Sequence, residues 1–233
     1  MANKKHKNKD KKNKKKKRNS CLYESTGKKI KQVDVYRNAE HLLGSSMTEQ
    51  VAHGKQVSML AYEVGKELGL DEEALRNLTI AGFFHDIGKT VLELDKQTDR
   101  VLLVEEMNSV QKHPEIGYEK LKDHGFSDEI CEAVLFHHEN YDGSGYPYNV
   151  EGWNIPLGAC VLRVCDVFCA LIQDRPYRKA FSPETAVHIM IEDVKKYDLK
   201  VFMALQRVLH RGPGGTIVLP ETAPEVEGVW REL

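Results

Sequence analysis

The chain has 233 residues, 41% of them hydrophobic, which is enough to bury one large core or two smaller ones. Its formal net charge of −1 hides an asymmetry: residues 1–20 hold ten lysines and one arginine against one aspartate, a net charge of +10, so the rest carries −11. The most apolar window, residues 156–172, is interrupted by Arg163 and Asp166, and no apolar stretch follows the basic start. We therefore expect neither a membrane-spanning helix nor a signal peptide.

The acidic body and the basic start suggest different partners. An acidic body suits a protein that concentrates carboxylates around divalent cations, although acidic residues dispersed over the surface give the same sum. Residues 1–20 have no apolar periodicity and repel one another, which predicts a disordered tail. Such a tail is usually solvated; the alternatives are contact with anionic lipid, which would place the protein at the inner membrane surface, and contact with nucleic acid. Residues 21–45 are poorly patterned and form a predicted linker.

The five cysteines are odd in number and include no Cys-x-x-Cys pair. Disulfides are rare in a reducing cytoplasm, so this usage is typical of a cytoplasmic protein. We therefore expect a cytoplasmic location.

The first strong helical pattern covers residues 46–68. Glu49 and His53 continue, at one end, a stripe that becomes apolar further along the helix. Because they are four residues apart, they lie on neighbouring turns and both side chains can reach one ion. A lone Glu/His pair on a helix is more often a solvated contact, so a metal site here requires further ligands nearby.

A second helix is predicted from Asp71, an N-cap residue that two glutamates follow. Its apolar stripe leads to the doublet His85 and Asp86. Gly88 then allows a turn that brings Lys89 back toward the doublet. His85 could bind one ion while Asp86 bridges two, and Lys89 would bind a phosphate oxygen or orient a carboxylate. An isolated His-Asp doublet is common by chance, so the doublet alone is a weak signal.

Residues 90–108 are polar and irregular, which predicts a loop. His113 precedes Pro114 at the predicted start of the next helix, because proline fits a first helical turn. Gly125 ends that helix. Taken alone, His113 is as readily a capping or surface histidine as a metal ligand.

Ser127 is predicted to cap a further helix, whose apolar stripe ends at the adjacent His137 and His138. A buried pair of imidazoles needs partners for up to four ring nitrogens, and neutral imidazole is the commonest protein ligand of transition metals. Residues 140–147 contain two glycines and a proline, which predicts an ordered loop at the rim of a site.

The most apolar predicted helix covers residues 155–172. Asp166 lies inside it, and a charge in such a helix is costly unless it is paired or bound to metal. Two further helices, predicted to start at Ser182 and Asp198, show only structural features.

Several separate motifs agree in order and spacing with one known family. They are His-Asp-Ile-Gly-Lys at residues 85–89, His-Pro-Glu-Ile-Gly at 113–117, and His-His with a later Gly-Tyr-Pro at 137–147. Over about residues 46–180 the chain resembles the HD-GYP family, the branch of the HD phosphohydrolase superfamily associated with bacterial cyclic dinucleotide hydrolysis. The resemblance implies an all-α helical bundle of HD-GYP type over residues 46–211, with 212–233 as a C-terminal tail.

The resemblance also implies a metal cluster and a substrate pocket. Two or three divalent ions, iron or manganese, would be bound by His53, His85, Asp86, His113, His137, His138 and Asp166, with Glu49 supporting an extra ion. Such a mixture of imidazole and carboxylate suits these metals better than structural zinc. Asp86 and Lys89 are the expected catalytic residues. The substrate would contact Lys89, Tyr146, Arg175 and Arg178, although the two arginines are alternatively surface charges.

The expected chemistry needs no protein nucleophile. A water bridging two cations would attack the phosphorus, while the cations and Lys89 neutralise charge on the phosphoryl oxygens. One position departs from the family pattern: the family has a second Asp three residues after the position of Asp166, and this chain has Cys169. Buried cysteines are usually small core residues, and a thiol cannot replace the carboxylate acceptor, so substrate affinity and base preference stay open.

We therefore predict a signal-transduction phosphodiesterase that hydrolyses cyclic di-GMP to linear pGpG; a further cleavage to GMP stays open. The alternatives are a non-catalytic cyclic-dinucleotide receptor, a docking module for a diguanylate cyclase (GGDEF) partner, and a phosphohydrolase of another nucleotide. A nucleic-acid-binding protein is supported only by the lysine tail, and that activity would disappear on removal of residues 1–20.

Overall fold

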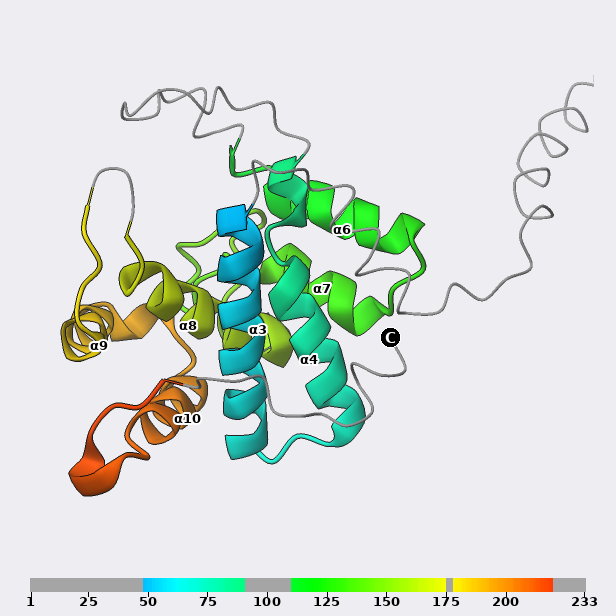
Figure 1. Ribbon diagram of the computed structural model, residues 1–233. Coiled ribbons are helices and arrows are strands. Elements are labelled where there is room, and N and C mark those ends of the chain that lie inside the picture. Colours follow the sequence, from blue (N-terminus) through cyan, green and yellow to red (C-terminus); the bar gives the residue numbers. More distant parts are fainter. Residues whose placement is uncertain (1–47, 91–109, 175–177, 220–233) are drawn as a thin grey trace, which may run out of the picture. The chain divides into compact units, whose positions relative to one another are not determined.

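In a computed structural model of the chain, residues 48–90, 110–174 and 178–219 are described (Figure 1). The predicted tail, the predicted linker, nearly all of the predicted loop 90–108 and residues 220–233 lie outside these ranges. The described ranges form helices and no strand, which confirms the predicted all-α class.

The helices begin and end within a few residues of their predicted bounds. They are α3 (Thr48–Glu67), α4 (Glu72–Phe84), α6 (His113–Asp123), α7 (Asp128–Phe136), α8 (Leu157–Leu171), α9 (Pro183–Glu192) and α10 (Leu199–Leu209), with the 3-10 turns η2 (Ile87–Thr90), η3 (Gly152–Asn154), η4 (Val194–Lys196) and η5 (Pro213–Gly215).

Four helix starts are fixed by the side chains that the sequence predicted as caps. Asp71 and Asp198 accept hydrogen bonds from the backbone three residues on, at 2.8 Å and 3.0 Å. Ser127 and Ser182 do the same at 3.4 Å and 3.2 Å. Each cap satisfies one N–H that the helix leaves unpaired, a contribution of roughly 1 kcal/mol.

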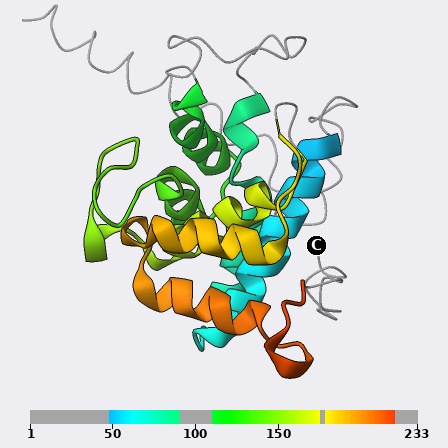
Figure 2. The same cartoon turned by 90° about the vertical axis from the view of Figure 1, so that its left-hand side faces the viewer.

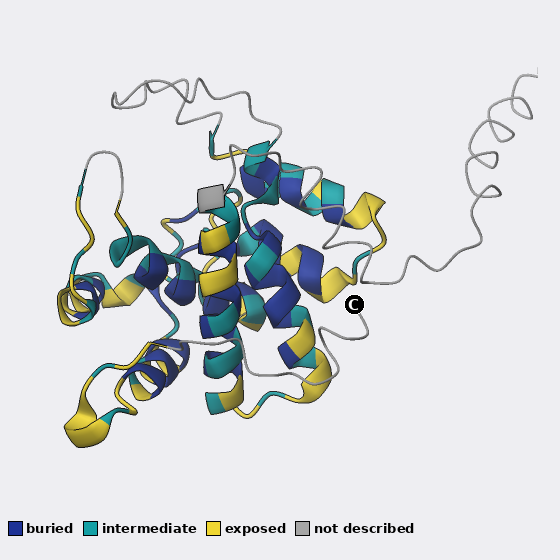
Figure 3. Ribbon diagram, in the orientation of Figure 1, coloured by how far each residue is buried: buried dark blue, intermediate teal, exposed yellow. Residues whose placement is uncertain are grey.

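The core lies between α3, α4, α7 and α8, whose buried faces are turned toward one another in Figure 3. Fully buried members include Val57, Ile80, Val134, Leu162 and Phe168. The apolar stripes predicted from the sequence are therefore the contact surfaces of the bundle. Helices α9 and α10 lie on one side of the bundle (Figure 2), and α10 packs on both α3 and α8.

Gly88 allows the turn that follows α4 to pack against the start of α6. A Cβ at Gly88 would lie 2.0 Å from the carbonyl oxygen of His113, so no other residue permits this approach. The contact brings η2, and Asp86 just before it, beside the first residue of α6. Within the described ranges, no helix combines the length and apolarity that crossing a membrane requires.

Candidate metal centre

Ligand-type side chains collect where several helices begin or end. His85 and His137 are the C-cap residues of α4 and α7, and His113 is the first residue of α6. Two groups of such side chains have ligand atoms within 4.8 Å of one another: Asp86 with His113, His137 and His138, and Asp86 with His53 and His85. Asp86 belongs to both groups, so its carboxylate lies between two potential ion positions.

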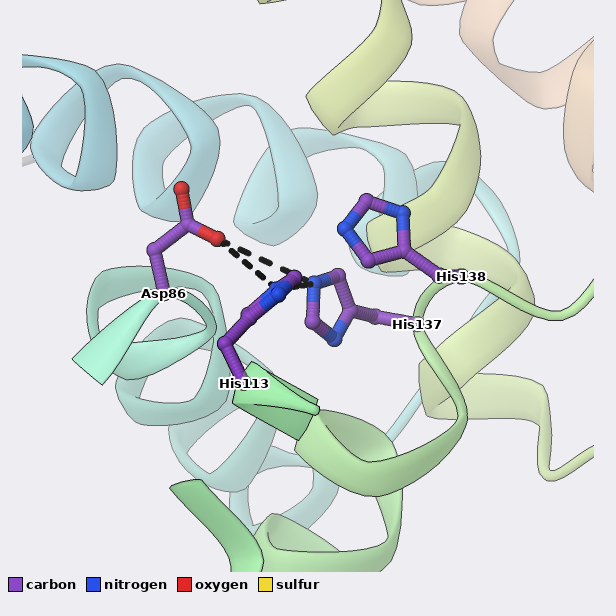
Figure 4. Close-up of side chains that lie close together, drawn as sticks. All are labelled: Asp86, His113, His137 and His138. Carbon is purple, nitrogen blue, oxygen red and sulfur yellow. Dashed lines mark hydrogen bonds and ion pairs between the residues drawn. The ribbon is translucent and has the colours of Figure 1, made fainter. Parts of the chain in front are cut away.

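The first group is arranged around one oxygen of Asp86 (Figure 4). The Nε2 of His113 lies 3.2 Å from Asp86 Oδ1 and 3.3 Å from the Nε2 of His137. The distance from His137 Nε2 to the same oxygen is 3.9 Å. The His138 ring lies beside that of His137, with centroids 4.0 Å apart. Three imidazoles and a carboxylate therefore face a common point.

The backbone fixes which ring nitrogen of three histidines faces this point. The Nδ1 atoms of His85, His113 and His137 lie 2.8, 2.7 and 2.6 Å from backbone carbonyl oxygens three residues earlier. A carbonyl only accepts hydrogen bonds, so each Nδ1 must donate. In the neutral ring, Nε2 then carries a lone pair directed at the carboxylates. Such an outer hydrogen bond orients a histidine that binds metal.

The second group, His53, His85 and Asp86, lies beside the carboxylate of Asp166. His53 Nε2 lies 2.9 Å from Asp166 Oδ1, and His85 Nε2 lies 3.4 Å from Asp86 Oδ2 and 3.7 Å from Asp166 Oδ1. Three buried atoms here have no hydrogen-bond partner: His53 Nδ1, His85 Nε2 and Asp86 Oδ1. Unpaired buried polar atoms are costly. A divalent cation between the imidazoles and carboxylates would satisfy the last two of these, so the residues fit a metal.

The pKa shifts of His137, His138 and Asp86 favour the protonation states that metal binding requires. Burial lowers the pKa of His138 to about 3, and burial together with His138 and His113 lowers that of His137 well below its usual value. Although burial opposes it, the charges of His85 and Lys89 hold the pKa of Asp86 well below its usual range. Neutral imidazoles and ionised carboxylates are the forms that bind metal.

His85 shows how strongly the carboxylates attract positive charge. Burial alone lowers its pKa, but the charge of Asp86 and the close contacts with the carboxylates of Asp166 and Asp86 raise it to about 10. The pKa of Asp166 is likewise held well below its usual range, against burial, by its contacts with His53 and His85. Without a metal, the proton on His85 supplies the positive charge at this position.

Lys89 contacts the shared carboxylate directly. Its Nζ lies 2.7 Å from Asp86 Oδ2. The ammonium group thus orients Asp86, while its partly exposed end remains open to a further anion.

The glycine-rich loop folds back over His138. The Tyr146 ring stacks on the His138 ring, with centroids 4.7 Å apart and planes at 26°, and the Tyr146 N–H donates to the His138 carbonyl. A Cβ at Gly145 would lie 2.3 Å from the backbone nitrogen of Asn140, so only glycine allows this fold. Glu139, 2% exposed, accepts a 2.7 Å hydrogen bond from the Tyr148 N–H. Tyr146 is therefore held over one of the imidazoles.

The remaining predicted site residues lie elsewhere or outside the described part. The side chain of Glu49 and all of Arg175 are outside it. The Arg178 guanidinium donates to the carbonyls of Ala170, Leu171 and Lys179, near the end of α8. Cys169 is 3% exposed and belongs to neither ligand group, and burial raises the pKa of its thiol.

Two residues near the cluster were not singled out from the sequence. Arg163 lies one turn before Asp166 on α8, and its Nε donates to Asn140 Oδ1 at 3.0 Å. The sequence did contain a signal for Arg163. A charged residue in an apolar helix is costly unless it has a partner, and this holds for the cation Arg163 as it does for Asp166. No sequence signal indicated Asn140 as its partner.

Comparison with known proteins gives a family match. Residues 37–201 match the family model described as HD domain. The cyclic di-GMP phosphodiesterase response regulator RpfG of Xanthomonas campestris is 37% identical over 164 residues, covering 66% of this chain and 42% of that protein. The 3'3'-cGAMP-specific phosphodiesterase 1 of Vibrio cholerae is 35% identical over 159 residues, covering 66% and 37%. The chain thus spans less than half the length of these relatives.

Two solved structures share the fold. Bd1817, an HDG"Y"P protein from Bdellovibrio bacteriovorus, superposes with a TM-score of 0.58 at 23% identity, over 76% of this chain and 56% of that one. The HD domain of the phosphodiesterase PgpH of L. monocytogenes gives a TM-score of 0.52 at 16% identity, over 70% and 92%. At such low identity, these likenesses concern the fold alone.

Proposed function

Because the chain belongs to the HD domain family, we propose that it is a metal-dependent phosphodiesterase of cyclic dinucleotides, with cyclic di-GMP as the first substrate to test. The observation that carries the proposal is the convergence of three Nε2 atoms, from His85, His113 and His137, on the carboxylate of Asp86. The names of the relatives support the substrate class, since they act on cyclic di-GMP or 3'3'-cGAMP.

The proposed ligands divide into two sets that share Asp86. One ion would be held by Asp86, His113, His137 and His138, the other by His53, His85, Asp86 and Asp166. The mixed imidazole and carboxylate donors favour iron or manganese. Glu49 would support a third ion. When bound, the cations supply a lowered pKa for a coordinated water and neutralise charge on phosphoryl oxygens.

The protein's own groups hold and shape this site. Lys89 orients Asp86 and offers its charge to a phosphate oxygen. Tyr146 presents a ring face above His138, where a nucleobase or ribose could pack. Arg175 and Arg178 are the further proposed phosphate contacts; for Arg178 this requires exchanging its carbonyl partners for substrate.

Water is the proposed nucleophile, because the described part of the chain offers no activated thiol. Cys131, Cys160, Cys165 and Cys169 are buried, and burial raises the pKa of each thiol. A reactive cysteine needs a lowered pKa. The product would be the linear dinucleotide pGpG, and GMP if a second phosphodiester is cut.

Cys169 favours a second candidate, a receptor that binds cyclic dinucleotides without turnover, because it removes a family carboxylate. Contacts with a diguanylate cyclase, and of the basic tail with a membrane or nucleic acid, remain predictions.

The test is turnover of cyclic di-GMP by protein loaded anaerobically with Fe(II) or Mn(II), followed by chromatography of the products. We expect pGpG or GMP from the wild type and none from Asp86→Asn. Asp123→Asn is a matched control, because Asp123 is exposed on α6. Metal-loaded wild type that binds cyclic di-GMP but makes no product would support the receptor instead. Equal activity of Asp86→Asn and Asp123→Asn would contradict the proposed centre.

A further inference from the structure

Helix α8 carries two charged residues on one face of an otherwise apolar sequence. They are Arg163 and Asp166, three residues apart, so their side chains emerge from neighbouring turns. Asp166 lies in the metal centre. Arg163 is half-buried, a costly position for a cation without a specific partner.

The loop that follows the histidine pair fixes one edge of the Arg163 guanidinium. Its Nε donates to Asn140 Oδ1 at 3.0 Å, and Asn140 is only 7% exposed. Asn140 in turn donates from Nδ2 to Ser144 Oγ at 3.0 Å, and Ser144 Oγ donates to Asp142 at 2.5 Å. Because this polar chain runs through the loop that carries Tyr146, the guanidinium has a set position relative to the Tyr146 and His138 stack.

The two terminal amino groups of Arg163 have no protein partner in the described ranges. Arg163 makes no ion pair there, and its hydrogen bond to Asn140 uses Nε alone. By contrast, Lys89 is paired with Asp86, and the terminal nitrogens of Arg178 are bonded to backbone carbonyls. Arg163 thus differs from Lys89 and Arg178, the two cations within the described ranges that the sequence predicted as phosphate contacts.

The loop also places Arg163 beside the site. Its partner Asn140 lies two residues after His138 in the chain, and Tyr146 of the same loop stacks on the His138 ring. The guanidinium is therefore close to the place where a substrate phosphate would approach His138.

We propose that Arg163 is a substrate-binding residue, which holds a phosphate oxygen of the cyclic dinucleotide through its free amino groups while Asn140 keeps the guanidinium oriented. Two parallel N–H groups match the two oxygens of a phosphodiester. The inference rests on the proposed function, and it adds a phosphate contact from inside α8 that family likeness did not assign.

The test compares steady-state kinetics of four variants on cyclic di-GMP. Arg163→Gln should raise KM about 10- to 100-fold, the effect of losing a charged hydrogen bond, with kcat changed less than about 3-fold. Arg163→Lys should restore part of the loss, because it keeps the charge without the planar fork. Asn140→Ala should have a smaller effect on KM, since only the orientation is lost. Arg76→Gln, which removes the same charge from the exposed face of α4, should match the wild type.

A tether between α8 and the loop is the rival role of Arg163. In that case Arg163→Gln and Asn140→Ala would have equal effects, and Arg163→Lys would rescue neither KM nor stability; that pattern, or an unchanged KM in Arg163→Gln, overturns the proposal. Metal content and thermal unfolding identify any variant that has lost the site. A wild type without turnover counts against the proposed function, and Arg163 is then judged by equilibrium binding of cyclic di-GMP. Weaker binding by Arg163→Gln would support it, and absence of binding by the wild type would overturn it.

Discussion

Helix α3 carries ionisable side chains near both ends, and the two ends differ in the burial and the partners of these side chains. Near its start, His53 is 6% exposed and contacts Asp166. Near its end, Glu63 and Glu67 form ion pairs with Arg207 and Arg211 of α10, at 2.6 to 3.1 Å. At the second end every carboxylate has a guanidinium partner in contact with solvent. At the first end, His53 Nδ1 and the neighbouring atoms His85 Nε2 and Asp86 Oδ1 are buried without a hydrogen-bond partner.

This difference shows which arrangement of charged side chains indicates that a further group, such as a metal ion, binds. A complete exposed pair gains little stability and requires nothing further. An incomplete buried set is costly, so it persists only where another group completes it. The cluster around Asp86 is of the second kind, because it contains buried imidazole and carboxylate atoms without hydrogen-bond partners. Changes at the buried end of α3 should therefore alter metal binding and activity, and changes at the exposed end should alter neither.

The largest effect is expected from Asp86→Asn. An amide cannot bridge two cations as a carboxylate does, so the metal content should fall by at least one ion per chain. Turnover should fall by more than about 100-fold, because loss of an outer partner alone costs about 10- to 100-fold. Elemental analysis and product chromatography measure the two effects. A wild-type metal content in Asp86→Asn would show that Asp86 is not the shared ligand.

Gly145→Ala should have the next largest effect. The added Cβ would collide with the backbone of Asn140 and with the His138 carbonyl oxygen, at 2.3 and 2.5 Å. We expect a loss of about 1–3 kcal/mol in the free energy of unfolding, as for other overpacked sites, together with a raised KM because Tyr146 loses its place. Urea unfolding measures the first quantity.

Gly152→Ala is the control just beyond this loop, at the first residue of η3. Gly152 has a φ of 60° but nothing near its missing Cβ, so only the strain of about 1 kcal/mol is expected, without a change in KM. Equal KM values for the two alanine variants and the wild type would show that the fold of the loop over His138 is irrelevant to substrate binding.

The pH dependence of the metal-free protein should be smaller but distinctive. The pKa of His85 is raised to about 10 in the folded state, against about 6.5 unfolded. A raised pKa means that protonated His85 stabilises the fold fully below pH 6.5, and that this stability is lost as pH rises through 10. Urea unfolding should therefore show a decline between pH 6.5 and 10 that His85→Gln lacks. Parallel pH profiles for the two proteins would contradict this assignment.

The smallest effect is expected at the exposed end of α3. Arg211→Gln removes contacts with Glu63 and Glu67, yet exposed pairs of this kind contribute less than about 1 kcal/mol. Urea unfolding should change by no more than that amount, and metal content and turnover should stay at wild-type values. A large loss of metal in Arg211→Gln would remove the contrast between the two ends.

Much of the fold was predictable because its signals are local. Caps such as Asp71 and Ser127 and the apolar stripes fixed the helices within a few residues, and the HD-GYP motifs correctly predicted family membership. The gathering of His53, His85 and Asp166 was expected only through family likeness, since contacts between α3, α4 and α8 are distant in sequence.

Other features depend on contacts that no local pattern encodes. The pairing of Arg163 with Asn140 joins an apolar helix to a loop 23 residues earlier. Arg178 was predicted as a phosphate contact from its basic segment, but its guanidinium bonds to the carbonyls that the end of α8 leaves free. A helix end and a substrate phosphate both attract a guanidinium, so sequence alone could not distinguish these partners.

The most direct test of the central claim is electron paramagnetic resonance of wild-type protein loaded with Mn(II), with the bound manganese counted in the same sample. Two ions that share the Asp86 carboxylate would lie close enough to couple magnetically, so we predict at least two manganese ions per chain and the spectrum of a coupled pair. A single uncoupled Mn(II) signal, or no bound manganese, would contradict the assignment of this buried cluster as a centre for two metal ions.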